Sequence, residues 1–343
     1  MHREAKRSLT PTIYDVAREA GVSYSTVSRT LSGYEFVKPS TREKVLRAAE
    51  KLGYVPNHQA RSLAGGRSHL IGVLVPGLNN SYIGEILRGI DEALAESEYN
   101  LLLYTTHRRQ GKESHYAATI MNSGVDGLLL VVPLMATPYL DTLHERDFPC
   151  VVIDQSEETQ KGAVVSGTNW QGAFEATEYL IGLGHCRIGF ISGLAGLTST
   201  TERLAGYSAA LAQHGLALDE RLIAEGSFLQ EGGYTAAQQL LALPDRPTAI
   251  FAANDLSALG AMEAVREHGL RIPKDISLVG FDDIPQASLG YPKLTTVRQP
   301  LSEMGREAAN ILLEEIAHPE QPRRRVTLPT KLIIRDSCCP PAG

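Results

Sequence analysis

Charged and amide side chains follow several short apolar runs of this chain, at the point where each run ends. They are Asp154 in CVVID, Asn254 and Asp255 in AIFAAND, Asp282 and Asp283 in LVGFDD, and Arg203 just after the loop LAGLTSTT. Ligands of open α/β sheets bind beyond the carboxyl ends of the strands. Carboxylates and amides exchange hydrogen bonds with hydroxyl groups, and a guanidinium donates in a fork. These residue types at these positions predict a site for a polyol.

Each of these residues also has a structural alternative. Asp282, Asp283 and Asn254 are suited to capping the helices that follow them. Arg203 is suited to an ion pair with Glu202 or with another nearby carboxylate. The residue types alone leave both interpretations open.

A second set of reactive side chains lies near the N-terminus, in GVSYSTVSRTLSG. Its members are Ser23, Tyr24, Ser25, Thr26, Ser28 and Arg29. Arg29 can bind guanine with two hydrogen bonds, and Tyr24 and Ser25 can reach bases or phosphates. The other three hydroxyls suit phosphate contacts, which position a protein without reading sequence, or helix capping.

The flanking sequence predicts three short helices that would hold this set. The first has Thr12 and Asp15 as a capping box, an apolar stripe of Ile13, Val16, Ala17 and Ala20, and Gly21 as its stop. Ser23 caps the second, with Val27 and Leu31 facing inward. The third opens with a Ser40–Glu43 capping box, packs through Val45, Leu46, Ala49 and Leu52, and ends at Gly53. Two short helices joined by a glycine turn predict a helix-turn-helix, whose second helix enters the DNA major groove. The alternative is a three-helix bundle with another partner.

Charge is unevenly distributed along the chain. Residues 1–67 contain 12 Lys and Arg against 6 Asp and Glu, whereas the remainder contains 21 against 33. A cationic module binds the phosphate backbone by releasing counterions, and an acidic body is repelled from it. The N-terminal part is therefore the expected DNA-binding part, with a merely solvated basic face as the alternative.

The two segments TIYDVAREAGVSYSTVSRTLSG and STREKVLRAAEKLGYVPNHQARSLAGGRSHLIGVLVP closely resemble the N-terminal signature of the lactose-repressor (LacI/GalR) family. The resemblance implies that Tyr24, Ser25 and Arg29 occupy base-reading positions. It also implies that PNHQARSLAGG is a hinge that becomes a short helix on operator DNA. In that hinge Leu63 matches the leucine that wedges between base pairs from the minor groove, and the residues around it are Asn57, Ala60 and Ala64.

The length of this hinge agrees with folding on DNA. The seven or eight residues between Pro56 and Gly65 are too few for a stable isolated helix, so order is expected only with a partner helix and DNA. Inserted leucines unstack a base step and bend the duplex. The alternative is a plain flexible linker.

From Leu70 onward short apolar runs alternate with helix-like segments. The runs are LIGVLVP, NLLLYTT, GLLLVVP, PCVVID, RIGFISG, AIFAAN and ISLVGFD. This alternation predicts an α/β core of parallel sheets covered by helices, in two doubly wound lobes. It resembles the periplasmic-binding-protein fold. We expect an all-α helix-turn-helix domain at 1–56, the hinge at 57–68, and a core at 69–337, with lobe 1 at about 69–168 and 298–325 and lobe 2 at about 169–297 and 326–337.

The same resemblance assigns effector contacts within this core. The matching positions are Tyr82, Asp154, Arg203, Phe228, Asn254 and Asp282. An aromatic such as Phe228 packs on the apolar face of a sugar ring. The purine-binding branch of the family has an arginine in the loop before Arg203, where this chain has Leu197, so the resemblance favours a sugar or sugar derivative.

Other functions find little support in the sequence. It contains no GxxxxGK[ST], HExxH or GxSxG motif, and GLAGL lacks the GxGxxG spacing. We therefore expect no catalysis, no cofactor and no metal, with His185 and Cys186 as a loop pair and all four cysteines reduced. No apolar run is long enough to cross a bilayer and Met1–Arg7 is polar, which predicts a cytoplasmic protein without a membrane partner.

Two rival interpretations remain at this point. One is a sugar-binding or sensing protein without a DNA role, which the basic head and the absence of an export signal disfavour. The other is a sugar-converting enzyme fused to a helix-turn-helix, which a turnover assay would reveal.

One short recognition helix reads few base pairs, so we expect a homodimer on a pseudo-palindromic operator. No useful heptad repeat follows Arg335, which disfavours a coiled-coil tetramer. Lobe closure around a ligand would separate the paired hinges and weaken operator binding; a ligand that brings the hinges together would act as a corepressor by the same linkage.

Overall fold

The computed structural model describes residues 11–31, 34, 36–54, 67–78, 80–109, 112–134, 137–155 and 162–342. These residues divide into an N-terminal unit that ends at Ser68 and a core that begins at His69. The predicted hinge contacts Asn57, Ala60, Leu63 and Ala64 lie outside the described residues.

The N-terminal unit consists of three short helices around one small core. They are α1 (Ile13–Ala20), α2 (Tyr24–Leu31) and α3 (Pro39–Leu52). The carboxylate of Asp15 accepts hydrogen bonds from the backbone N–H and the hydroxyl of Thr12, as the capping box predicts. Gly21 ends α1 in the left-handed region with φ 67°. Fully buried Val16, Val27 and Val45 hold the three helices together.

Two predictions about α3 are wrong. The helix begins at Pro39 with Lys38 as its N-cap, and Glu43 pairs with Arg47 instead of closing a capping box. Proline is favoured at the first helical position because its φ is already helical and its missing N–H needs no partner there. Leu46 is 50% exposed, and the smaller Ala48 takes the inward position.

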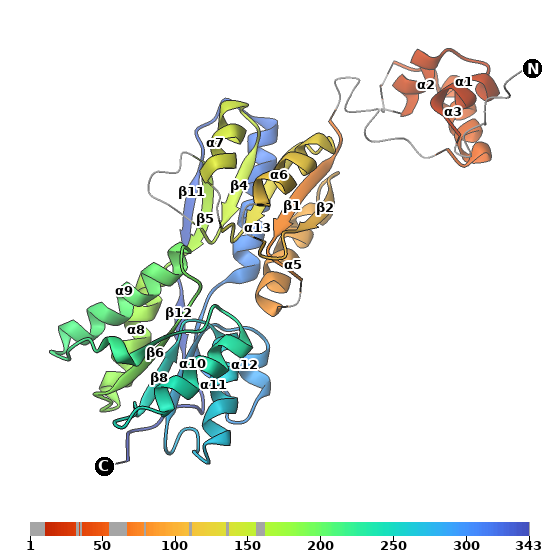
Figure 1. The fold of residues 1–343 in the computed structure, drawn as a ribbon. Coiled ribbons are helices and arrows are strands. Elements are labelled where there is room, and N and C mark those ends of the chain that lie inside the picture. The colour runs from red at the N-terminus through yellow and green to blue at the C-terminus, as the bar shows by residue number, and fades with distance from the viewer. Residues whose placement is uncertain are drawn as a thin grey trace, which may run out of the picture. The chain divides into compact units, whose positions relative to one another are not determined.

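The first lobe of the core is a six-stranded sheet covered by helices on both faces (Figure 1). Its strands are β1 (Leu70–Val75), β2 (Asn100–Thr105), β3 (Gly127–Val131), β4 (Cys150–Ile153), β5 (Ala163–Gly167) and β11 (Arg325–Leu328), in the order β11-β5-β4-β3-β1-β2, and all of its pairs are parallel. One face packs against α5 (Ser81–Ala95) and α13 (Leu301–Ala317). The other packs against α6 (Glu113–Asn122) and α7 (Thr137–Glu145).

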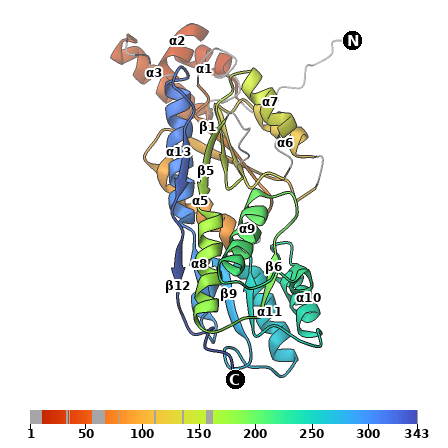
Figure 2. The same ribbon diagram turned by 90° about the vertical axis from the view of Figure 1, so that its left-hand side faces the viewer.

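The second lobe repeats this arrangement. Its strands are β6 (Ile188–Ser192), β7 (Ile223–Glu225), β8 (Ala249–Ala252), β9 (Ser277–Asp282), β10 (Thr295–Arg298) and β12 (Lys331–Ile333), in the order β12-β10-β9-β8-β6-β7. Only the β10–β12 pair is antiparallel among the described strands. The faces are covered by α8 (Asn169–Gly182) with α9 (Thr198–Gln213), and by α10 (Gln230–Leu241) with α11 (Asp255–Glu267) (Figure 2). The 3-10 turn η1 (Glu220–Leu222) and α12 (Gln286–Leu289) complete this lobe.

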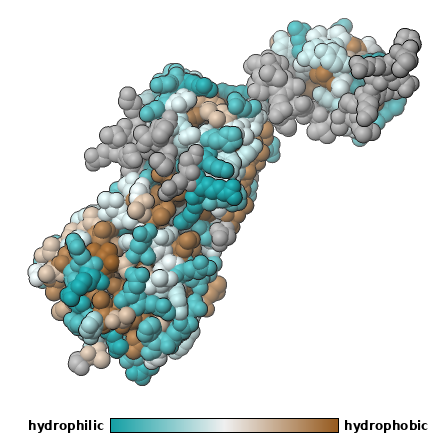
Figure 3. Space-filling view, viewed as in Figure 1, coloured by the Kyte–Doolittle hydropathy of each residue, from teal (hydrophilic) through white to brown (hydrophobic). Residues whose placement is uncertain are grey.

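The chain passes between the lobes three times within the described core. The passages lie between β5 and α8, between β10 and α13, and between β11 and β12. Because β11 extends to Leu328 in the first sheet, the last passage falls after that residue rather than near 326. The face of the core visible in Figure 3 mixes hydrophilic and hydrophobic residues. No helix in the described part of the chain is long and apolar enough to span a membrane.

Candidate effector and nucleic-acid sites

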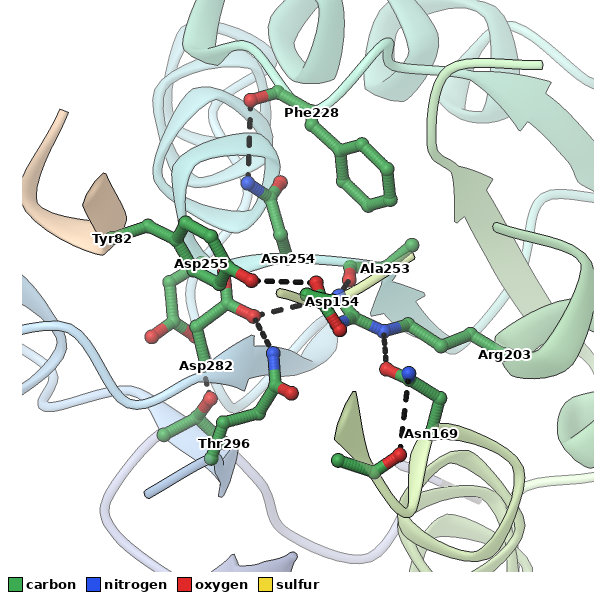
Figure 4. A network of polar contacts seen from close by, with 12 residues as sticks. Tyr82, Asp154, Asn169, Arg203, Phe228, Ala253, Asn254, Asp255, Asp282 and Thr296 are labelled. Atoms are coloured by element: carbon green, nitrogen blue, oxygen red, sulfur yellow. Dashed lines mark hydrogen bonds and ion pairs between the residues drawn. The ribbon is translucent and has the colours of Figure 1, made fainter. Parts of the chain in front are cut away.

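A cavity of about 40 Å³ lies between the two lobes of the core. All six residues assigned to effector contact line it, namely Tyr82, Asp154, Arg203, Phe228, Asn254 and Asp282. Asp154 follows β4 and Asp282 ends β9, whereas Asn254 is the residue before α11. The structure therefore brings together strand-end residues that are far apart in sequence, as Figure 4 shows.

Arg203 on α9 lies at the centre of this polar network and is only 2% exposed. Its Nε donates to Oδ1 of Asn169 at 2.8 Å, and its Nη1 donates to the carbonyl of Ala253 at 2.5 Å. The same Nη1 lies 3.4 Å from Oδ1 of Asp282. Its Cζ is 3.8 Å from the ring centroid of Phe281, a cation–π contact. Arg203 thus pairs with a cavity carboxylate, and Glu202 is not its ion-pair partner.

The two cavity carboxylates are buried and differ in their partners. Asp154 accepts a hydrogen bond from the hydroxyl of Tyr82 at 2.5 Å through Oδ2, and its buried Oδ1 has no hydrogen-bond partner among the described residues. Asp282 accepts from Nε2 of Gln299 at 2.9 Å. Burial raises the pKa of Asp154 and raises that of Asp282 to about 7, while Arg203 opposes both shifts. An orphaned oxygen and a costly charge at one cavity are features of a ligand site.

The backbone at the cavity is strained. Asp154, Asp282 and Phe228 have φ values of 57°, 110° and 59°, in a region that side chains with a Cβ rarely adopt. Such residues cluster at ligand-binding sites, where the surrounding structure maintains the strain. A close contact also fixes Phe228, because a Cβ on Gly193 would lie 2.0 Å from Cζ of its ring.

Helix capping and cavity lining prove compatible at Asn254. Its Oδ1 accepts from the backbone N–H of Ser257 at 2.9 Å, so it caps α11, and its Nδ2 donates to the carbonyl of Phe228 at 3.2 Å. The neighbouring aspartates have other roles. Asp255 is fully buried and binds Thr296. Asp283 pairs with Arg298 and Arg335 and caps no helix.

Several residues at the cavity are not among those predicted from the sequence. Asn169 and Gln299 hold Arg203 and Asp282, and Arg108 lines the cavity from the loop after β2. Asn169 and Gln299 follow the ends of β5 and β10, so the strand-end rule finds them once those strands are recognised. Leu197, at the loop position discussed above, is buried and forms part of the wall.

The candidate DNA-contacting residues of the helix-turn-helix lie on α2 and at its N-terminal end. Tyr24, Ser25 and Arg29 are exposed, with Tyr24 stacked on Tyr14 at 5.1 Å and Arg29 over the ring of Tyr34 at 5.7 Å. Ser23 uses its hydroxyl oxygen to accept from the N–H of Thr26 at 3.2 Å, so it caps the helix. Its Oγ also lies 2.8 Å from the hydroxyl of Thr26. Ser28 and Thr26 are partly buried.

The remaining predicted features are structural. His185 is buried, with its ring nitrogens 2.8 Å from the hydroxyl of Thr248 and 3.0 Å from that of Ser277. Its exposed neighbour Cys186 does not share these contacts, and all four cysteines are free. Within the described residues no group of His, Cys, Asp or Glu side chains is arranged to hold a metal ion.

A helix-turn-helix unit joined to a two-lobed core with a cavity between the lobes defines the class of ligand-responsive transcription regulators. Residues 12–57 match the model of bacterial regulatory proteins of the lacI family, and residues 177–338 match the periplasmic binding protein-like domain. The chain therefore belongs to the lacI family, and it is a DNA-binding transcriptional regulator.

Relatives and solved structures agree with this assignment along nearly the whole chain. Catabolite control protein A of Priestia megaterium is 35% identical over 95% of this chain and 98% of that protein. The HTH-type transcriptional repressor PurR of Photobacterium profundum is 36% identical over the same shares. The lac repressor dimer bound to operator and the anti-inducer ONPF aligns with a TM-score of 0.84 at 31% identity, covering 96% of this chain and 99% of that one. The complex of the regulator CelR with cellobiose aligns with a TM-score of 0.74 at 35% identity, covering 95% and 99%.

Proposed function

We propose that this regulator is a repressor that binds a pseudo-palindromic operator as a homodimer and changes its operator affinity when a saccharide or saccharide derivative enters the core. The observation that supports the effector class is one cavity that brings together the carboxylates of Asp154 and Asp282, the amide of Asn254, the guanidinium of Arg203 and the Phe228 ring. Hydroxyl groups exchange hydrogen bonds with the first four, and the ring packs on the C–H face of a sugar. The apolar Leu197 in the wall favours a saccharide over a nucleobase.

DNA recognition is assigned to α2 and to the hinge. Tyr24, Ser25 and Arg29 are exposed on one short helix, so they can reach base edges, while Ser23, Thr26 and Ser28 contact phosphates. In the hinge, Leu63 enters the minor groove, flanked by Asn57, Ala60 and Ala64. The protein acts on DNA in the cytoplasm and catalyses no reaction.

A thermal-shift screen of the full chain tests the effector assignment, because a ligand of the folded state raises the melting temperature. The panel contains monosaccharides, disaccharides, sugar phosphates and nucleobases. A saccharide response lost in Asp282→Ala and Arg203→Ala supports the proposal when the matched pair Asp275→Ala and Arg271→Ala, an ion pair of the same lobe outside the cavity, keeps it. A nucleobase response refutes the saccharide assignment. Each sugar is also incubated with the protein and then analysed for products, and a product would contradict the proposal that the protein catalyses no reaction.

A titration with operator sequences selected from random DNA tests the proposed DNA recognition by α2. Arg29→Ala is expected to weaken cognate binding by about 1–3 kcal/mol and to relax specificity at one position. Arg146→Ala, the same charge change on the exposed surface of the core, serves as the control. Equal losses in the two variants would mean that Arg29 reads no base, and an operator affinity that no ligand shifts would contradict the allosteric part.

A further inference from the structure

Arg108 connects the effector cavity with a second and larger space. It lies in the loop after β2 in the first lobe and lines both the cavity and an adjacent cleft of about 830 Å³. The two spaces also share Pro76 and Asn80. The cleft is bounded on the second lobe by the start of α10. A ligand that fills the cavity and extends beyond it therefore passes Arg108.

The charge of Arg108 has no carboxylate partner in the described part of the chain. Its Nη1 donates to the backbone carbonyl of Ser227, across the lobes, at 3.1 Å. Burial lowers the pKa of Arg108, because it disfavours the charged form of the guanidinium. The four other buried or partly buried arginines described in the core each pair with an Asp or Glu: Arg187, Arg203, Arg323 and Arg335.

The backbone around Arg108 holds it in this position at a cost. His107 and Arg108 have φ values of 52° and 51°, in the left-handed region. His107 is held by a contact of 2.9 Å between its Nε2 and the hydroxyl of Thr105. Two consecutive strained residues that place a charged side chain at the mouth of a cavity indicate a role in binding rather than in packing.

Among the described residues, no acidic side chain of the cleft forms an ion pair with Arg108. Glu231 on α10 lines the cleft but is exposed and not within ion-pair distance of Arg108. The first turn of α10 contains Glu231 and has no side-chain cap, so its backbone N–H groups favour negative charge. Inside the cavity, Arg203 pairs with Asp282, and the hydroxyl of Tyr82 donates to Oδ2 of Asp154.

We propose that Arg108 binds an anionic group of the effector, a carboxylate or a phosphate, so that the effector is a sugar acid or a sugar phosphate. This inference rests on the proposed function and names the charged substituent of the proposed saccharide. A guanidinium forms two short, parallel, charge-assisted hydrogen bonds with a carboxylate or a phosphate. A neutral hydroxyl or the Ser227 carbonyl cannot accept such a pair of bonds. Arg108 is then the residue that selects charged saccharides over neutral ones.

Calorimetric titration of the full chain at constant ionic strength tests this selection. The probes are sets of one stereochemistry: glucose, glucuronate and glucose 6-phosphate, with the corresponding galactose and mannose sets. The best acid or phosphate is expected to bind about 10-fold to 100-fold more tightly than its neutral parent. Comparison of acid with phosphate identifies which anion the site prefers. Arg108→Gln removes most of the preference for the charged over the neutral saccharide, and Arg108→Lys retains part of it. The control Arg109→Gln, at an exposed neighbouring residue, retains all of it.

The outcomes separate this inference from the proposed function. If neutral sugars bind as tightly as their charged forms, or if Arg108→Gln keeps the preference, the inference is overturned and the saccharide assignment stands. If no saccharide of any charge binds the wild-type chain, both are overturned. Melting temperatures of the variants are measured alongside, so that loss of preference is not mistaken for loss of folding.

Discussion

Replacing Asp282 with asparagine tests the electrostatics of the cavity. The carboxyl is 4% exposed, and burial raises its pKa to about 7 even though Arg203 and Gln299 stabilise its charge. Asparagine has nearly the same shape and no charge. The variant therefore keeps the packing and removes the ionisation.

The sign of the effect follows from proton binding. An aspartate in the unfolded chain has a pKa of about 3.9, so between this value and about 7 the folded protein binds more protons at Asp282 than the unfolded chain does. Stability from this group is therefore lost as pH rises, by up to about 1.4 kcal/mol per pH unit, and the loss levels off above pH 7. Between pH 5 and pH 8 the variant should gain about 2 to 3 kcal/mol relative to wild type.

Urea unfolding followed by the fluorescence of Trp170 measures this gain. Trp170 is the single tryptophan of the chain and lies on α8 in the same lobe, stacked on Phe174. Asp275→Asn serves as the control. Arg271 holds the pKa of Asp275 at about 2, so its contribution is lost only below about pH 4 and its difference curve is flat in this window.

A difference between Asp282→Asn and wild type that is constant from pH 5 to pH 8 would refute the reasoning. A difference that falls with rising pH would mean that Arg203 stabilises the charge more than burial destabilises it. Saccharide binding is measured in the same variant and should be weakened. A charge that lowers the stability of the folded protein at neutral pH is expected at a cavity only if it contributes to ligand binding.

Three further substitutions test the packing of the cavity, of its supporting strands and of the N-terminal helix-turn-helix unit. Gly193→Ala places a Cβ 2.0 Å from Cζ of Phe228 and should lower saccharide affinity about 10-fold or more in calorimetry, whereas Gly182→Ala, whose Cβ meets nothing within 4 Å, should leave it unchanged. Thr296→Val removes the 2.5 Å hydrogen bond to buried Asp255 and should lower the free energy of unfolding by about 1–3 kcal/mol in urea, and an unchanged midpoint would show that this bond contributes nothing. Val27→Ala opens the core of the helix-turn-helix at a cost of about 2 kcal/mol and should weaken operator binding in a gel-shift assay while saccharide binding by the core persists.

All seven apolar runs noted in the sequence form strands, β1 to β4, β6, β8 and β9. They were recognisable because strands buried on both faces of a parallel sheet read as continuous apolar segments. The strands that were not foreseen are short or contain polar residues. β12 has three residues, Lys331–Ile333, and forms the edge of its sheet beside β10, so its position depends on tertiary pairing rather than on its own sequence.

The cavity was predictable to the same extent as its strands. Asp154, Asn254 and Asp282 follow strands that the sequence reveals, whereas Asn169 and Gln299 follow β5 and β10, which it does not. The choice at Arg203 between Glu202 and another carboxylate depends on which side chain the fold brings within reach, and only the structure identifies Asp282. Leu46 was predicted to face inward, but it lies on the exposed side of α3, and Ala48 takes the inward position.

One passage between the lobes lies one hydrogen bond away from the cavity. Gln299, which donates to Asp282, belongs to the passage between β10 and α13, and a Cβ on Gly167 would lie 2.6 Å from its Oε1. Thr168 in the first passage bonds Thr330 in the last one, hydroxyl to hydroxyl at 2.8 Å. A ligand that competes for Asp282 therefore changes the partners of a residue that lies in one connection and packs against the end of β5, where another connection begins. Because lobe rotation must occur at those connections, differential contact at Asp282 is a direct means for an effector to bias the lobe arrangement.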